Sequence, residues 1–400
     1  MSSLPTAAPR RAIPVPMLAT LALLSAIAPL AIDMYLPGLP ALGADLHTSP
    51  AAAQLTLTTF MLGLAAGQLL MGPLSDSLGR RRPLVLGTTL LIVAGIGCAV
   101  APSIGVLVAF RFIQGLTGGI GVVVARAVIA DRTEGDSAAK LFSIMMIITS
   151  AAPVAAPLIG GALIGPIGWR GIFGVLTGLA VLMLLAVLAF VPESLPRERR
   201  HDFHAGAIAR NVGTVLKNRR YLGYTLCFSV GFGAMFAYIS ASPFIIQDLM
   251  GFSPGVFSLL FAINAVGIGM AGTVNTRLVG LVRPQRLLAI GVGMLVTVGV
   301  AMMLTTVLAP DLHWLLLVLM FCLTSSFGLT AGNATALALG QVRETAGSGS
   351  AVLGTLQFLI GAIVPPLAGL GGASSAIPMA TVVLVCTLLS AAAFATTLRE

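Results

Sequence analysis

Ionisable side chains that could do chemistry are few in this sequence, and Asp33 stands out among them by its position. It lies inside a run of about 20 apolar residues, long enough to cross a bilayer. An ionisable residue in such a run is costly, and it usually faces a polar cavity on a substrate or ion path. Because burial disfavours a charged carboxylate, Asp33 could bind and release a proton near neutral pH. The alternative is a carboxylate near the helix end that only reaches interfacial water, since Pro37 is four residues further on.

A second charge, Arg111, lies about seven residues into another apolar run. It could be a structural cation that donates hydrogen bonds to helix carbonyls. Alternatively, Arg111 and Gln114 form a polar cluster that tunes the proton affinity of a nearby acid, because an opposite charge favours the carboxylate. We therefore expect Asp33 and Arg111 to be proton-coupling residues.

Between two apolar runs lies the polar segment GPLSDSLGRRRP at 72–83. Its Gly72–Pro73 pair predicts a helix end, followed by a tight turn in which Asp76 pairs with an arginine or a helix N-terminus. A plain topogenic turn would account for the arginines alone, but not for the spacing of the glycines and the acid. The candidate gating residues are Gly72, Asp76, Gly79, Arg80 and Arg81.

The segment SAAPVAAPLIGG at 150–161 places Pro153 and Pro157 four residues apart and ends on Gly160 and Gly161. Prolines at this spacing would kink one face of a helix. The small residues would allow another helix to approach closely. Packing alone is the competing explanation of this pattern.

The elements that must position these residues follow from composition. Hydrophobic residues make up 57% of the 400 residues and charged residues only 9%, against roughly a quarter in a soluble domain. The net charge of +9 does not indicate a nucleic-acid binder, because the arginines lie in short gaps between apolar runs. The four cysteines lie inside apolar runs, and the four histidines lie in connections. We find no metal site and no catalytic pairing, so we expect no enzyme, no metal and no cofactor.

Twelve apolar runs are long enough to span a membrane, which predicts an all-α integral membrane protein. The expected spans are 15–36, 52–74, 83–101, 104–126, 140–163, 169–191, 221–245, 254–276, 285–309, 312–336, 346–369 and 374–397. Lys and Arg fall almost entirely in alternate connections, and the other side receives only Arg170, which predicts that both termini are cytoplasmic. The long polar stretch 192–220 predicts a cytoplasmic linker between two six-helix halves, 1–191 and 221–400.

These motifs together resemble those of the major facilitator superfamily, in particular its twelve-helix drug:proton antiporters. The 72–83 segment matches the family signature after the second helix, RFIQG at 111–115 matches the fourth-helix motif, and 150–161 matches the antiporter motif, with Ala156 where that motif has Gly. The segments IDMYLPGLP at 32–40 and PESLPRERR at 192–200 resemble the bicyclomycin/chloramphenicol-resistance (Bcr/CflA) branch. The resemblance implies proton-coupled efflux of such antibiotics, with Asp33 binding proton and substrate and Arg111 taking part in coupling.

From this we expect alternating access about a central cavity, in a monomer of the bacterial inner membrane whose partners are a small drug, protons and lipid. The cavity wall should be apolar and aromatic with sparse polar groups. Besides Asp33 and Arg111, the candidates are Tyr35, Thr56, Phe60, Gln114, Tyr238, Phe244, Phe261, Asn264, Asn333, Gln357 and Phe358. A carrier of a small metabolite, such as an amino acid or a nutrient, is the alternative with the same fold.

Overall fold

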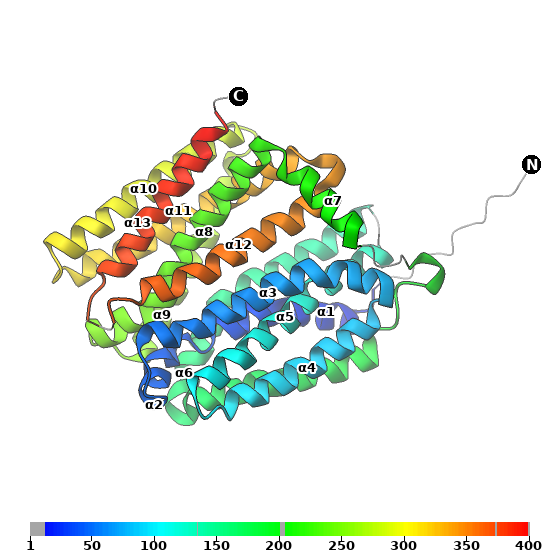
Figure 1. Ribbon diagram of the computed structural model, residues 1–400, viewed down its shortest axis with the longest axis horizontal. Helices are drawn as coiled ribbons and strands as arrows, with labels where there is room; N and C mark the ends of the chain where they lie inside the picture. The colour runs from blue at the N-terminus through cyan, green and yellow to red at the C-terminus, as the bar shows by residue number, and fades with distance from the viewer. Residues whose placement is uncertain (1–12, 134, 201–204, 373, 399–400) are drawn as a thin grey trace, which may run out of the picture.

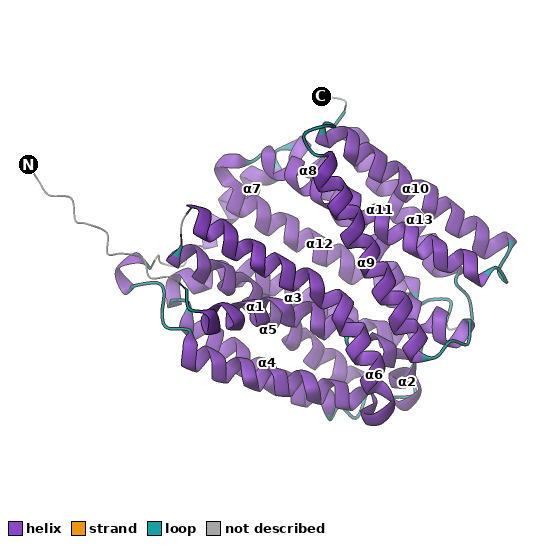
Figure 2. Cartoon of the chain, turned by 180° about the vertical axis from the view of Figure 1, so that it is seen from behind, coloured by secondary structure: helices purple, strands orange, loops and turns teal. Residues whose placement is uncertain are grey.

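The protein forms a bundle of long helices, seen here in a computed structural model that describes residues 13–133, 135–200, 205–372 and 374–398 (Figure 1). Figure 2 shows helices and loops throughout the described chain. The only β-type pairing among the described residues is an isolated bridge between Val279 and Val282. The long helices are α1 Val15–Asp33, α3 Pro50–Leu78, α4 Arg81–Ala99, α5 Ile104–Arg132, α6 Gly135–Phe190, α8 Arg219–Phe244, α9 Pro254–Leu278, α10 Pro284–Leu308, α11 His313–Gly340, α12 Ala346–Ala368 and α13 Ile377–Thr396. The short ones are η1 Leu36–Gly38, α2 Leu39–Asp45, η2 Arg197–Arg199, α7 Ala205–Leu216, η3 Ile245–Leu249 and η4 Arg343–Thr345.

Eleven helices of the described chain are long and apolar enough to cross a membrane. One of them, α6, has 56 residues and contains a non-helical residue at Gly168, with φ 64°. At 1.5 Å per residue it would measure about 84 Å, roughly twice the thickness of a bilayer. Two of the expected spans, 140–163 and 169–191, therefore lie in α6 on either side of Gly168, and the positive φ is one that glycine adopts without strain.

Two details differ from the sequence-based expectations, and the stretch expected to be a linker contains a helix. Gly72–Pro73 does not end a helix, because α3 continues to Leu78 and only then reaches Gly79, with φ 89°. A proline inside a membrane helix frees a single carbonyl, and packing against neighbouring helices holds the rest of the helix together. The stretch 192–220, expected to be a polar linker, contains the helix α7.

The second difference concerns the end of the first span, which was expected over 15–36. Helix α1 ends at Asp33, and the chain continues through a turn and η1 into α2. Pro37 and Pro40 lie in this segment and lack the N–H groups that would extend α1. Leu36, Pro37 and Gly38 are all buried, so the irregular backbone is enclosed by other helices, as backbone at membrane depth must be.

The helices pack in two sets, which we call the first set, α1 to α6, and the second set, α8 to α13. Within the first set, α5 contacts α1, α3 and α4, while α6 contacts α1 and α4. Within the second, α8 contacts α11, α12 and α13, and α10 contacts α11 and α13. The sets meet mainly where α3 lies against α12 and where α6 lies against α9 (Figure 1).

Charged residues distinguish the two ends of the bundle. Arg80 bonds Asp131, and Arg200 lies by Glu193, at what we call the arginine-rich end. Asp45 bonds both Trp169 and Arg170 at the opposite end. Arg170 thus lies away from the other clustered arginines, as the distribution of basic residues in the sequence predicts.

Candidate substrate and proton site

Arg111 is fully buried in the first set and is enclosed by aromatic rings. Its guanidinium carbon lies 4.2 Å from the ring centroid of Phe60, 4.5 Å from that of Tyr35 and 5.7 Å from that of Phe173. The faces of aromatic rings attract cations, and more strongly where water is excluded. The rings therefore stabilise a charge that would otherwise be very costly at this depth.

Hydrogen bonds fix the orientation of the same guanidinium. Nη1 donates to Gln114 Oε1 at 2.6 Å and to the Ala31 carbonyl at 3.0 Å, and Nε donates to the Thr56 carbonyl at 3.3 Å. Ala31 belongs to the last turn of α1, whose carbonyls have no donor further along the helix. Arg111 thus caps the broken end of α1. Its Nη2 has no hydrogen-bond partner although it is buried.

Asp33 is the last residue of α1 and is only 5% exposed. Among the described residues, no side chain or backbone group donates a hydrogen bond to its carboxylate, and no cation pairs with it. Arg111 is therefore a neighbour, bonded two residues away at Ala31, rather than an ion-pair partner of Asp33. The bonds from Arg111 to the Ala31 and Thr56 carbonyls are those expected of a structural cation. The bond to Ala31 also places the guanidinium at the last turn of α1, which ends at Asp33.

Tyr35 and Thr56 complete this side of the site. The Tyr35 hydroxyl lies 2.9 Å from Thr56 Oγ1, and the Tyr35 ring packs on Phe173, with 5.4 Å between centroids. Four of the candidates from the sequence are thus brought together with Arg111, namely Tyr35, Thr56, Phe60 and Gln114. Phe173 was not among those candidates, because nothing in its local sequence separates it from a packing residue.

Tyr238 and Asn264 form a polar pair in the second set. Asn264 Nδ2 donates to the Tyr238 hydroxyl at 2.6 Å, and the Tyr238 ring stacks on Phe261. Asp33 is close enough to Tyr238 for the two to interact electrostatically. This pair therefore faces the first set near the end of α1.

The remaining cavity candidates lie elsewhere or make no polar contact. Asn333 donates to Asn275 Oδ1 at 2.6 Å, and Asn275 is eleven residues beyond Asn264 along α9, toward its other end. That spacing separates the two pairs by about 16 Å along the helix. Phe244 is buried, while Gln357 and Phe358 are partly exposed on α12.

Gly160 and Gly161 allow two close approaches of α6. A Cβ at Gly160 would collide with the carbonyl oxygen of Met34, in the turn directly after Asp33. A Cβ at Gly161 would collide with Ser258 on α9, in the second set. The helix runs unbroken through Pro153 and Pro157. Through these two glycines, α6 contacts both the turn after α1 and helix α9 of the second set.

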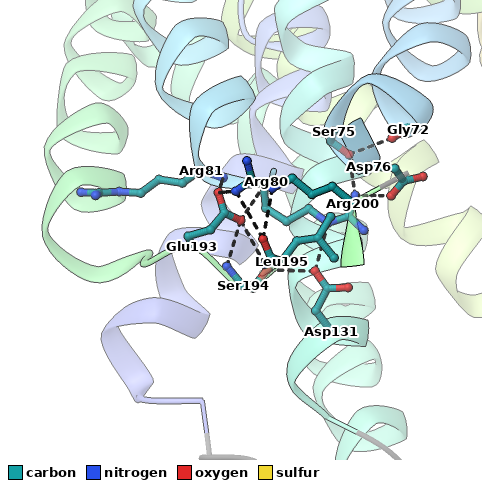
Figure 3. A network of polar contacts seen from close by, with 10 residues as sticks. All are labelled: Gly72, Ser75, Asp76, Arg80, Arg81, Asp131, Glu193, Ser194, Leu195 and Arg200. Carbon is teal, nitrogen blue, oxygen red and sulfur yellow. Dashed lines mark hydrogen bonds and ion pairs between the residues drawn. The ribbon is translucent and has the colours of Figure 1, made fainter. Parts of the chain in front are cut away.

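Four of the five candidate gating residues, all except Gly79, are seen in a network of polar contacts at the arginine-rich end (Figure 3). Arg80 pairs with Asp76 at 2.6 Å and with Asp131 at 3.0 Å, and it also bonds Ser75. Gly72 contributes a carbonyl that accepts from Ser75 at 2.9 Å. The pairing of Asp76 with an arginine, expected from the sequence, is present.

Glu193 anchors the start of the 192–220 stretch on this network (Figure 3). Its carboxylate accepts from the backbone N–H groups of Arg80 and Arg81, at 2.8 and 3.3 Å, and from that of Leu195. Burial alone would raise the pKa of Glu193, but these N–H groups and the nearby Arg200 hold its pKa below the usual value. Gly79 lies directly against this carboxylate, where a Cβ would collide with it.

Asp131, Glu193 and Ser194 were not among the gating candidates. Ser194 Oγ and Arg80 Nε both donate to Asp131 Oδ2, at 2.9 and 3.0 Å. The only sequence signal for Glu193 and Ser194 is their place in the PESLPRERR segment. The network therefore joins the turn after α3, the end of α5 and the chain after α6.

A bundle of membrane-length helices around a buried acid and a buried arginine is the arrangement expected of a membrane transporter. Sequence comparison agrees, because the Major Facilitator Superfamily model matches residues 21–365, and the chain belongs to this family. It is 37% identical over 376 residues to the uncharacterized MFS-type transporter YdgK of Bacillus subtilis strain 168, covering 94% of this chain and 93% of that one. It is 31% identical to a bicyclomycin resistance protein homolog of Haemophilus influenzae, covering 94% of each chain.

Solved structures show the same fold. The xylose transporter XylE from E. coli superposes with a TM-score of 0.71 at 15% identity, covering 96% of this chain and 97% of that one. A bacterial homolog of the human lysosomal transporter Spinster superposes with a TM-score of 0.69 at 17% identity, covering 96% and 94%. At these identities the likeness concerns the fold alone.

Proposed function

We propose that this transporter exports small antibiotics in exchange for protons. The observation that carries the proposal is Asp33, an almost fully buried acid without a hydrogen-bond donor, at the broken end of α1. Burial and the negative end of the α1 dipole both disfavour the carboxylate form of this acid. An acid in such surroundings is suited to exchange a proton as those surroundings change.

Transport would follow from competition between proton and drug at Asp33. Drug entering from the cytoplasm or the inner leaflet displaces the proton inward, and a proton from outside later displaces the drug outward. The two sets of helices would rock as halves around this site. For a neutral drug and one proton, a potential of 100 mV supplies about 2.3 kcal/mol, enough for a gradient of roughly 50-fold.

The proposed substrates are bicyclomycin or phenicols such as chloramphenicol. Similarity to the bicyclomycin resistance protein homolog supports this class. Tyr35, Phe60 and Tyr238 are buried aromatic residues, and a wall of aromatic residues with few polar groups suits a small and mostly apolar drug. Asp76 on α3 and Asp131 on α5 pair with Arg80 at the arginine-rich end, whereas Asp33 has no such partner and is the acid proposed to meet the ligand.

The orientation belongs to the same proposal. The clustered arginines at one end support cytoplasmic termini and a place in the bacterial inner membrane by the positive-inside rule. The protein would act as a monomer, driven by the proton gradient without a cofactor. The network around Arg80 and Glu193 would then lie in the cytoplasm.

The test is accumulation of chloramphenicol and of bicyclomycin in cells that express the parent, Asp33→Asn or an empty vector, each with and without a protonophore. We expect the parent to lower accumulation of one drug and the protonophore to restore it. Asp33→Asn should reach the membrane at the parental level and behave like the empty vector. A parent that sits in the membrane and changes neither drug would reject the proposed substrates, and a nutrient-dependent growth phenotype would instead identify a metabolite carrier.

A further inference from the structure

Two hydrogen bonds join the first and second sets of helices within the described parts of the chain. Thr58 Oγ1 on α3 donates to the Ala362 carbonyl on α12 at 2.7 Å, and Gln247 Nε2 in η3 donates to the Pro37 carbonyl in η1 at 3.2 Å. Both acceptors are backbone carbonyls rather than side chains. In both cases a proline further along the chain explains why the carbonyl has no hydrogen-bond donor within its own helix.

The Ala362 carbonyl cannot be satisfied in the regular pattern of its own helix. An α-helical carbonyl accepts from the N–H four residues on, and a 3-10 carbonyl from the N–H three residues on. For Ala362 these positions are Pro366 and Pro365, which have no N–H. Ala362 is only 1% exposed, and an unsatisfied carbonyl at membrane depth is strongly destabilising. Thr58 therefore supplies a donor that α12 itself lacks.

The Pro37 carbonyl is in a similar position. It lies in the 3-10 segment η1, where the residue three positions on is Pro40. Pro40 cannot close the 3-10 turn, and α2 begins only at Leu39. Gln247, from the π-helical end of α8, fills the vacant position. Each set of helices thus offers one such carbonyl to a side chain of the other set.

Both bonds lie toward the opposite end of the bundle, where the two sets are in contact. Other contacts between the sets lie there too: the site of a Cβ at Gly369 is 2.8 Å from Gln54 Oε1, and Gly161 packs on Ser258. Thr58 is the ninth residue of α3, counted from this end, and Ala362 is six residues from the end of α12. When the sets separate here, both bonds must break, and water can then reach the two carbonyls.

We propose that Thr58 and Gln247 set the balance between the closed and the open state of the opposite end, an inference that rests on the proposed alternating access. With the end closed, each carbonyl depends on a single side chain across the interface. With the end open, water satisfies it, because bulk solvent replaces the lost donor. Removing the side-chain donor therefore destabilises the closed state and leaves the open state nearly unchanged. Neither residue needs to touch the drug or the proton.

The experiment measures how often the opposite end opens. Ser258, 2% exposed and packed under Gly161, is replaced by cysteine in the full-length chain, and the rate of labelling by a water-soluble maleimide is measured in detergent without drug. The chain without Ser258→Cys gives the background from its native cysteines. Thr58→Val removes the donor at nearly equal volume, and Thr58→Ser keeps it. Thr59→Val is the matched control, because the Thr59 hydroxyl bonds Leu55 of its own helix.

We expect Thr58→Val to raise the labelling rate about tenfold, the effect of leaving a buried acceptor unpaired. Thr58→Ser and Thr59→Val should stay within about twofold of the parent. If Thr58→Val does not accumulate in the membrane, Gln247→Leu tests the second bond in the same assay and should also speed labelling. Equal rates in Thr58→Val and Thr58→Ser, or in Gln247→Leu and the parent, overturn the role assigned to that residue.

Proline substitution provides a second arm. Pro366→Ala restores an N–H four residues after Ala362, so Thr58→Val should change the labelling rate much less in this background than in the parent. Equal effects in both backgrounds would contradict the proline-based explanation. These measurements involve no drug, proton gradient or transport. They can therefore support the role of Thr58 and Gln247 even if the proposed substrates are rejected, and they can reject that role even if the substrates are confirmed.

Discussion

The guanidinium carbon of Arg111 lies 4.2 Å from the ring centroid of Phe60, so the most deeply buried charge of the first set rests on an aromatic face. The same guanidinium donates to the carbonyls of Ala31 and Thr56. It is therefore fixed in place by α1, α3 and its own helix α5. It meets α1 through the Ala31 carbonyl and forms no ion pair with Asp33.

This arrangement predicts that lysine cannot replace Arg111. An ammonium group lacks the planar fork that bonds Gln114 and two carbonyls while stacking on rings. We expect Arg111→Lys to abolish drug efflux and to lower the free energy of unfolding by about 2 kcal/mol or more. The measurements are drug accumulation and thermal unfolding in detergent. Arg126→Lys, an exposed position on the same helix, should retain both, and an active Arg111→Lys protein would show that charge alone suffices.

The proposed competition at Asp33 predicts a pH-dependent drug affinity. Because a proton and the drug exclude each other there, lowering the pH should weaken drug binding by up to about tenfold per pH unit, the limit for one proton. Asp33→Asn should bind drug with an affinity that no longer changes with pH. Binding to purified protein, measured by calorimetry across pH 6 to 8, checks this. Asp45→Asn, which only loses its bonds to Trp169 and Arg170, should keep the parental pH dependence, and a pH-dependent Asp33→Asn protein would refute the assignment.

Glu193 predicts a different pH effect, at the arginine-rich end. Its pKa lies below the usual 4.5 when folded, so the stability it contributes is present above pH 4.5 and is lost as the pH falls through the lowered pKa. Glu193→Gln should therefore lower the free energy of unfolding by about 1 to 2 kcal/mol, by a constant amount between pH 5 and 8. The difference from the parent should shrink under more acidic conditions.

Thermal unfolding of both proteins over this pH range is the measurement. Glu198→Gln is the control, because Glu198 is exposed in η2. A Glu193→Gln protein as stable as the parent at pH 7 would mean that the bonds of this carboxylate to the backbone N–H groups and to Arg200 contribute nothing to the free energy of unfolding. A difference that grows toward acidic pH would contradict the sign of the pKa shift.

Much of the fold could be predicted because membrane spans leave a simple record in composition. Length and hydropathy located the long helices, and the arginines separated the two ends. A helix end near Pro37 was expected from the sequence. The turn, η1 and α2 that follow Asp33 were not, because their burial against α6 and η3 depends on packing. The interruption of α6 at Gly168, where φ is 64°, falls between two of the expected spans, 140–163 and 169–191.

The candidate site shows the same division. Arg111, Gln114, Tyr35 and Phe60 were candidates by type and position, and they do meet. Phe173 could not be found, because it reaches Arg111 from 62 residues away and resembles any other buried phenylalanine. For the same reason nothing in the sequence joins Thr58 to Ala362, although the Pro365–Pro366 pair marks a carbonyl in need of a donor.

The pair Gly160 and Gly161 yields a final prediction, about how α6 couples the broken helix to the interface between the sets. Gly161→Ala would drive a methyl group into Ser258, pushing α6 away from α9. Gly160→Ala would push on the Met34 carbonyl and displace the turn after Asp33. We expect both to lose efflux, and Gly161→Ala also to increase the exposure of the opposite end to maleimide at a nearby engineered cysteine.

Gly165→Ala provides the control on the same helix, because a Cβ there meets nothing within 4 Å. Alanine is the better helix former by about 1 kcal/mol, so Gly165→Ala should be as active as the parent and at least as stable. Efflux and labelling, measured together on the three variants, separate the two roles. If Gly161→Ala lost efflux without added exposure, the glycine would serve drug or proton binding rather than contact between the sets. Full efflux in Gly160→Ala would show that the position of the turn after Asp33 tolerates displacement, and that the close approach of α6 there is packing alone.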